Sequence, residues 1–213
     1  VGDSSKQVGT FSNKELKREI RRRLDTLQPG YLLLMGVDNL KTINMKNGRN
    51  FGDAVLSDVA RVIEDETHRN NTVYRINGDW FAVNLATSSQ NEVSEVFSRI
   101  QERLSGQCTI SGGGVSYTDY HVADEGMLLQ YAEISLDYSK NHGKNTITFF
   151  TPENYESKLR ELELREDLKK SIEEDFDGFE LFYQGQVYSE TYELYGAEAL
   201  LRYRSPRLGN ISP

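Results

Sequence analysis

The sequence predicts an α/β sandwich, in which helices cover both faces of a central, mainly antiparallel sheet. Residues 31–37 are a continuous apolar run, typical of a strand buried on both faces. Residues 72–84 read as a β-hairpin around Asn77-Gly78, since Asn and Gly tolerate the positive φ of a two-residue turn. Segments with apolar residues at helical spacing alternate with these strands. Strands mixed with crossover helices indicate an α/β domain, and the hairpin makes its sheet mainly antiparallel.

The first helix is predicted over residues 12–27. Ser12 and Glu15 have the spacing of a capping box, and Pro29-Gly30 ends the segment. Its apolar stripe recurs every fourth residue and consists of Leu16, Ile20 and Leu24.

The remaining elements of this domain follow the strand at residues 31–37. Asp38 is expected to cap a short helix that runs through Asn44. An amphipathic helix over residues 53–64 should bury Ala54, Leu56, Val59, Ala60 and Ile63. After the hairpin come a helix at 91–104, a strand at 108–117 broken by Gly112-Gly113-Gly114, a helix at 124–141 and a strand at 146–150.

The chain divides into a domain at residues 1–150, a connecting helix at 151–176 and a C-terminal segment at 177–213. Thr151-Pro152 is a good helix start. The C-terminal segment should form strands at 180–187 and 192–204. About 60 residues after the first domain are too few for an ordinary independent core.

Composition excludes several classes of protein. A net charge of −8 over 213 residues argues against a general nucleic-acid or membrane-surface binder. Cys108 is the only cysteine, which rules out an intrachain disulfide and indicates an inert thiol in a reducing compartment. The apolar runs are too short to span a bilayer, and no signal peptide is apparent, so we expect a cytoplasmic protein. The start at Val1 and the end at Pro213 suggest a piece of a larger protein.

Several segments resemble, in order and spacing, the motifs of bacterial GGDEF domains, which make cyclic di-GMP from GTP. Residues 77–81 (Asn-Gly-Asp-Trp-Phe) align with the signature hairpin of that family. The other similar segments are residues 36–44 (DxDxFKxIN), 48–53 (GHxxGD), 132–145 (ADxALYxAKxxGRN) and, in a worn form, 8–14 (LTGLxNR). The resemblance covers residues 8 to about 148 and implies a GGDEF-like α/β sandwich.

Asn44 and Asp53 stand where the family reads guanine. A carboxylate beside an amide suits the N1–H, N2 amino and O6 edge of that base. The resemblance therefore implies guanine contacts, although the residues alone also allow a helix-end cap for Asn44 and a helix N-terminal charge for Asp53.

Binding of a triphosphate requires backbone N–H groups at a helix start together with cations. The helix that begins near Asn39 is expected to supply the N–H groups. Lys41, Lys140 and Lys144 are the candidate cations, and Lys140 and Lys144 match basic positions of the family. Taken singly, each of these lysines is as typical of an exposed helix face as of a phosphate-binding site.

The acids that hold Mg²⁺ in the family are only partly retained. Those acids activate the nucleophile through divalent ions, and their positions here read Gly36, Asp79 and Trp80. Asp79 is therefore a vestigial catalytic and metal-binding residue, and Asp38 is a weak substitute ligand. The resemblance implies a Mg²⁺ cofactor whose binding is weakened by Gly36 and Trp80, and we expect Trp80 to fill or cover the old metal pocket.

The inhibitory product site of the family, RxxD, falls at residues 68–71, which read His-Arg-Asn-Asn. Neither the arginine nor the aspartate is in position, so product feedback by that route is not expected. His68, His121 and His142 read as surface histidines without metal-binding spacing.

The C-terminal segment resembles the start of an EAL domain, the family that hydrolyses cyclic di-GMP. Residues 183–185 (Tyr-Gln-Gly) are similar to its YQP, and residues 198–203 (Glu-Ala-Leu-Leu-Arg-Tyr) to its EALLRW. In a complete EAL domain the resemblance implies a metal ligand at Glu198 and cyclic di-GMP contacts at Gln184 and Arg202. The segment would form a β-hairpin of an incomplete EAL barrel, so this chain should not be a phosphodiesterase, whereas its full-length parent should be one.

These observations lead to a main functional hypothesis and to alternatives. The main hypothesis is a degenerate GGDEF domain that binds GTP, or acts as a regulatory module, for an attached EAL phosphodiesterase of the same parent chain. An active diguanylate cyclase with a non-standard metal site is one alternative, and a dimerisation scaffold without nucleotide binding is another. The unpaired strand edges of the C-terminal segment lead us to expect packing on a neighbouring chain, as in a homodimer, or on the first domain.

Overall fold

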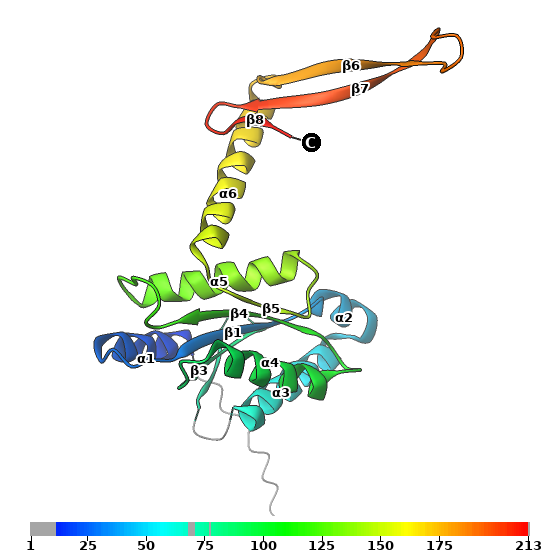
Figure 1. Ribbon diagram of the computed structural model, residues 1–213. Coiled ribbons are helices and arrows are strands. Elements are labelled where there is room, and N and C mark those ends of the chain that lie inside the picture. Colours follow the sequence, from blue (N-terminus) through cyan, green and yellow to red (C-terminus); the bar gives the residue numbers. More distant parts are fainter. Residues whose placement is uncertain (1–11, 68–70, 77, 213) are drawn as a thin grey trace, which may run out of the picture. The chain divides into compact units, whose positions relative to one another are not determined.

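The computed structural model describes residues 12–67, 71–76 and 78–212. It separates into two compact units, Val1–Tyr155 and Glu156–Pro213. Figure 1 labels the elements, which we describe unit by unit. The part of the worn motif at residues 8–11, and His68, lie outside the described residues.

The first unit is built on a five-stranded sheet with the strand order β2-β3-β1-β4-β5. The strands are β1 (Tyr31–Val37), β2 (Val73–Arg75), β3 (Trp80–Leu85), β4 (Ile110–Ser116) and β5 (Ile147–Phe149). The central strand β1 pairs antiparallel with β3 and β4, and only β4 and β5 pair in parallel. The predicted α/β fold with a mainly antiparallel sheet is therefore confirmed.

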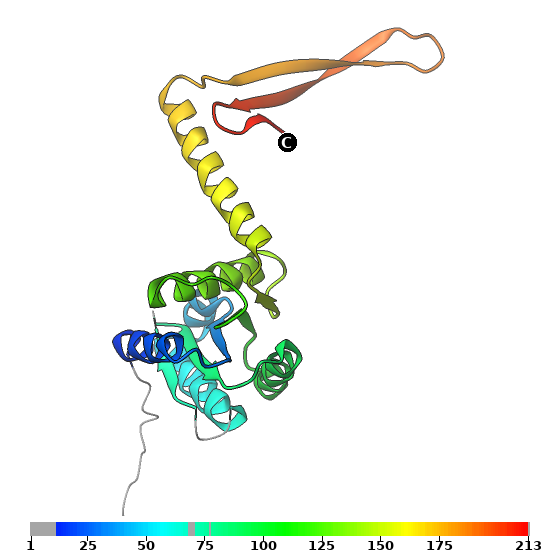
Figure 2. The same ribbon diagram turned by 60° about the vertical axis from the view of Figure 1, so that its left-hand side comes forward.

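Helices cover both faces of this sheet, as Figures 1 and 2 show. The helices are α1 (Asn13–Asp25), α2 (Leu40–Asn47), α3 (Arg49–Glu66), α4 (Gln90–Leu104) and α5 (Glu125–Asn141). All seven residues of β1 are buried. Leu33 and Met35 belong to the cluster under α3 and α4, whereas Leu32 and Leu34 belong to the cluster under α1 and α5. Because successive side chains of a strand point to opposite faces of the sheet, the single apolar run of β1 contributes to both cores.

The predicted capping box of the first helix is present: Ser12 N–H donates to Glu15 Oε2 at 2.7 Å. The helix ends at Asp25, earlier than predicted, and Leu27 is exposed. Leu16 and Ile20 are fully buried.

Three local predictions were wrong. Asp38 does not cap the short helix: α2 begins at Leu40 with Asn39 as its N-cap residue at φ +56°. Helix α3 begins at Arg49, before the predicted start, and Ala54 is exposed. Strand β4 runs unbroken through its glycines, each of which is paired with β1. A Cβ at Gly113 would lie 2.3 Å from Ala132 O of α5. The glycine lets α5 pack directly on the strand.

The hairpin turn is also longer than predicted. Ile76 N–H donates to Trp80 O at 2.8 Å, so three residues rather than two connect the paired positions. Gly78 has φ +76°, the left-handed conformation that three-residue hairpin loops place on glycine. Asn77 lies outside the described residues.

The second unit contains most of α6 (Pro152–Glu173) and a three-stranded antiparallel sheet in the order β6-β7-β8. These strands are β6 (Phe179–Val187), β7 (Leu194–Ser205) and β8 (Gly209–Ile211), of which β8 was not predicted. Among the described residues, no helix is both long enough and apolar enough to cross a membrane.

Candidate nucleotide-binding site

Gly36 and Trp80 are direct cross-strand partners in the β1–β3 ladder. A Cβ placed on Gly36 would lie 3.1 Å from Trp80 Cδ1. Trp80 itself is half-buried and packs on the cluster under α1 and α5. The indole of Trp80 therefore lies next to the space that a side chain at position 36 would take.

Lys140, near the C-terminal end of α5, reaches the same place from the helix above. Its Nζ lies 3.7 Å from Asp79 Oδ2, 3.4 Å from the carbonyl oxygen of Val37 and 5.7 Å from the centroid of the Trp80 ring. The side chains of Lys140 and Asp79 are only 21% and 32% exposed. This arrangement pairs the candidate metal ligand Asp79 with an ammonium group of the protein.

Asp38 is buried, and its carboxylate is hydrogen-bonded within the protein. Its carboxylate accepts hydrogen bonds from Thr109 Oγ1 at 2.9 Å, Ser111 Oγ at 2.7 Å and the backbone N–H of Asn145 at 3.0 Å. These bonds join the end of β1 to β4 and to the segment after α5. Three hydrogen bonds use most of the acceptor sites of this carboxylate, and a role of Asp38 as a substitute metal ligand stays a prediction.

The segment after α5 also brings Lys144 to the start of α2. Lys144 Nζ donates to Asn39 Oδ1 at 2.6 Å. Lys140 and Lys144 therefore both meet residues 37–39, where the predicted phosphate-binding helix begins. Lys41 is exposed in the first turn of α2.

Asn44 and the first turn of α3 come together because α2 and α3 are joined through a single residue, Gly48, at φ +86°. The side chain of Asn44 lies against the first turn of α3: a Cβ on Gly52 would fall only 1.7 Å from Asn44 Oδ1. That oxygen is buried and has no hydrogen-bond partner among the described residues. Asp53 follows Gly52 and is exposed. A buried acceptor without a partner beside an exposed carboxylate can receive a ligand with adjacent N–H donors.

The cysteine and the described histidines take no part in this site. Burial raises the pKa of the Cys108 thiol to about 11, and the nearby Asp38 and Asp58 add to the shift, so the thiol is inert at neutral pH. His121 is exposed, and His142 stacks on Tyr138 with 3.8 Å between ring centroids. Within residues 12–67, 71–76 and 78–212, no group of three or more His, Cys, Asp or Glu is placed to hold a metal ion.

The candidate residues of the C-terminal unit lie on β6 and β7. Gln184 pairs with Glu198 across the ladder, and Arg202 pairs with Glu180. The only register shift lies beyond Gln186, so Glu198 and Arg202 share one face of the sheet, as predicted. Arg202 donates to the carbonyl oxygen of Leu201 at 2.9 Å.

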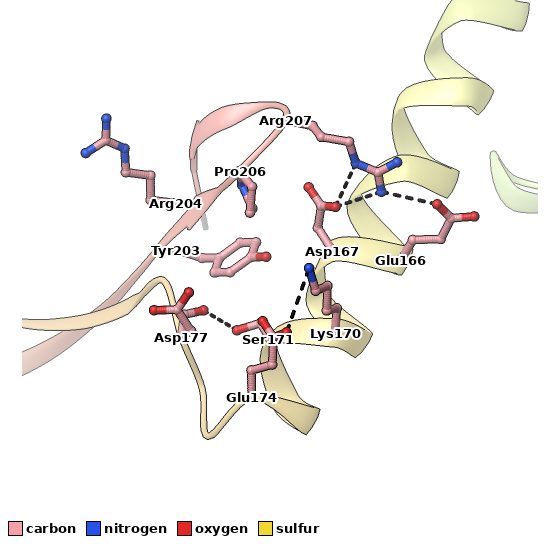
Figure 3. A pocket seen from close by; sticks show the side chains of 10 residues that line it. All are labelled: Glu166, Asp167, Lys170, Ser171, Glu174, Asp177, Tyr203, Arg204, Pro206 and Arg207. Carbon is pink, nitrogen blue, oxygen red and sulfur yellow. Dashed lines mark hydrogen bonds and ion pairs between the residues drawn. The ribbon is translucent and has the colours of Figure 1, made fainter.

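A cavity of about 370 Å³ lies between α6 and β7 in this unit (Figure 3). Asp167 accepts hydrogen bonds there from Arg207 Nε at 2.7 Å and from Ser205 Oγ. Glu166 also pairs with Arg207, at 3.2 Å. The cavity contains none of Gln184, Glu198 and Arg202, and its polar groups serve mainly to tie the helix to the strand.

The family model for "Diguanylate cyclase, GGDEF domain" matches residues 10–146. The chain belongs to this family. It therefore carries a GGDEF domain, the type of domain that occurs in proteins of cyclic di-GMP signalling.

Relatives and solved structures agree with this assignment. The chain is 28% identical over 193 residues to the cyclic di-GMP phosphodiesterase PdeR of Escherichia coli strain K12, a match covering 85% of this chain and 28% of PdeR. It is 26% identical over 192 residues to MucR of Pseudomonas aeruginosa, a bifunctional diguanylate cyclase and cyclic di-GMP phosphodiesterase, with 85% and 27% covered. The chain thus spans roughly a quarter of the length of these relatives.

Among solved structures, the GGDEF domain of DgcB from Caulobacter crescentus in complex with c-di-GMP superposes with a TM-score of 0.60 at 21% identity. The match covers 70% of this chain and 98% of the DgcB chain. At that identity the likeness establishes the GGDEF fold of the first unit and not its ligand.

Proposed function

We propose that this GGDEF domain binds a guanine nucleotide without converting it to cyclic di-GMP and acts as a regulatory module for an attached EAL phosphodiesterase. The observation that carries the proposal is the contrast between the candidate guanine-binding residues, which are retained, and the expected metal-binding acids, which are mostly replaced. Asn44, which is suited to guanine, lies against Gly52, the residue before the second candidate, Asp53, whereas two of the three acids expected at the metal are Gly36 and Trp80.

The geometry around Asn44 supports nucleotide binding. Leaving a buried acceptor unsatisfied costs about 1–3 kcal/mol, which a guanine N–H donor would recover. Gly52 is the residue that makes room for this side chain, because any Cβ there would overlap with Asn44 Oδ1. Asp53 adds a charged acceptor on the adjacent residue of α3.

The basic groups support binding of the phosphates. Lys140 and Lys144 reach residues 37–39 from α5 and from the segment after it, and Lys41 stands on the first turn of α2. The N-terminal N–H groups of α2 lie at the same place, where an anion is favoured.

The regulatory part of the proposal rests on the relatives and on the C-terminal segment. The matches to PdeR and MucR cover 85% of this chain, more than the first unit alone could provide, so the similarity continues past residue 146. Both relatives are described as phosphodiesterases, MucR as a cyclase as well. With residues 177–213 read as the start of an EAL domain, Glu198, Gln184 and Arg202 would contribute to the phosphodiesterase site of the full-length protein.

Calorimetric titration with GTP, with ATP as the comparison, tests the nucleotide-binding part. We expect saturable heat for GTP and a loss of about 1.5–3 kcal/mol of binding free energy in Asp53→Ala, because a charge-assisted hydrogen bond is removed. Absence of saturable heat in the wild-type chain would leave only a scaffold role. Chromatography of the same mixture after incubation with Mg²⁺ should find GTP intact, and formation of cyclic di-GMP would instead support an active cyclase.

A further inference from the structure

Lys140 takes up the space into which a side chain at position 36 would project. A Cβ on Gly36 would lie 2.8 Å from Lys140 Nζ and 2.9 Å from its Cε. Gly36 is buried in β1 between β3 and β4. A side chain at this position would point toward α5, where Lys140 lies. The end of the lysine, and not solvent, fills the space.

The groups around the ammonium are those that bind cations. A carboxylate oxygen of Asp79, the carbonyl oxygen of Val37 and the ring face of Trp80 surround it at 3.7, 3.4 and 5.7 Å. Carboxylate and carbonyl oxygens are ligands of hard cations, and an indole face attracts positive charge. This is a cation site that the protein fills with its own side chain.

A divalent ion does not fit beside these residues. It would have to approach Asp79 next to an ammonium of like charge, and such repulsion is strong in a half-buried place. The nearby carboxylate of Asp38 already accepts three hydrogen bonds. No third acid completes a metal-binding group in the part of the chain that the structure describes.

We propose that the ammonium of Lys140 replaces the divalent metal, so that the site takes a guanine nucleotide in its metal-free form. This inference rests on the nucleotide binding proposed above. An ammonium has three N–H donors, and the interactions with Val37 and Asp79 leave donor capacity for a phosphate oxygen. Lys144, bonded to Asn39, supplies a second positive charge nearby.

Titration of the full chain with GTP in EDTA and in Mg²⁺ tests this directly. We expect the dissociation constants to agree within about threefold, or to be lower in EDTA, because no metal bridges protein and phosphate. An affinity that rises about tenfold or more on addition of Mg²⁺ overturns the inference while the proposed nucleotide binding stands. Absence of GTP binding in both buffers overturns both proposals.

Lys140→Met separates a role in binding from a role in folding. In EDTA the variant should bind GTP about tenfold or more weakly, since a charged donor to phosphate is lost. Lys46→Met, at an exposed lysine in the last turn of α2, is the matched control and should bind as the wild type does. Equal GTP affinities of Lys140→Met and the wild type, with both chains folded by circular dichroism, would contradict the proposal.

A titration with Mn²⁺ alone reports on the cation site without any nucleotide. Electron paramagnetic resonance of the wild-type chain should show no saturable binding in the sub-millimolar range, because Lys140 already neutralises Asp79. Saturable Mn²⁺ binding that Asp79→Asn abolishes would overturn the inference.

Discussion

The side chain of Trp80 lies beside the empty position of Gly36, its direct partner across the β1–β3 ladder, and Lys140 lies over both. A Cβ on Gly36 would lie 2.8 Å from Lys140 Nζ and 3.1 Å from Trp80 Cδ1, so the absence of a side chain at position 36 leaves room for both groups. An indole and an ammonium therefore lie beside Asp79, the one acid that is retained of the three expected from the family motifs.

Gly113→Ala and Gly36→Ala should differ sharply in stability. The new Cβ at position 113 would meet the backbone of α5, at 2.3 Å from Ala132 O and 2.4 Å from Leu136 N, and the backbone cannot move aside. We expect a loss of about 3 kcal/mol or more for Gly113→Ala and of about 1 kcal/mol for Gly36→Ala, where a flexible lysine end can give way. Urea denaturation measures both, and equal losses would contradict the packing described here.

Gly52→Ala should impair GTP binding without unfolding the domain. Its Cβ would displace the side chain of Asn44, so the amide would no longer stand beside Asp53. We expect the affinity for GTP to fall by about tenfold. Gly126→Ala, at an exposed glycine in the first turn of α5, is the control and should leave the affinity unchanged. An unchanged GTP affinity in folded Gly52→Ala would show that Asn44 is not a contact.

Asp38→Ala should destabilise the first unit. Removing the buried carboxylate leaves Thr109, Ser111 and the N–H of Asn145 without their acceptor. A cost of about 3 kcal/mol is expected from unsatisfied buried donors. Chemical denaturation measures it, with Asp25→Ala at the end of α1 as a comparison. Unchanged stability of Asp38→Ala would contradict the structural role that these three hydrogen bonds give to Asp38.

The pair of Asp167 and Arg207 should make the second unit sensitive to acid. The hydrogen bond from Arg207, and then that from Ser205, holds the pKa of Asp167 below its ordinary value of 3.8. A carboxyl with a lowered pKa stabilises the folded state above its unfolded pKa, and this stabilisation is lost as the pH falls through the folded pKa. Asp167→Asn should therefore lower the melting temperature at neutral pH, and its difference from the wild type should shrink as the pH falls below 3.8 and through the lowered pKa of the folded state. Asp175→Asn, at an exposed position, is the control; a pH-independent difference for Asp167→Asn would contradict this account.

Much of the fold could be predicted because its signals are local. The capping box of Ser12 and Glu15, the apolar run of β1 and the order of helices and strands depend on neighbours in sequence. Strand β8 was missed because Gly-Asn-Ile has little β propensity, so its pairing with β7 is decided by tertiary contacts.

The contacts of the candidate site could be predicted only in part. Gly36 and Trp80 were recognised from the motifs, and their direct pairing followed from the sheet. The role of Asp38 could not be predicted, since its partners Thr109 and Ser111 are 71 and 73 residues away in sequence. Lys140 was expected at the phosphates, but its position over Trp80 depends on how closely α5 packs on β4, which no local pattern specifies.

The most direct test of nucleotide binding at this site is a titration of the isotope-labelled chain with GTP, followed by the backbone amide resonances. The account predicts saturable shifts that cluster at Asn44, Gly52 and Asp53 and at Lys140, with the amides of β6 and β7 unchanged. Absence of any shift, or shifts confined to residues outside this cluster, would contradict it.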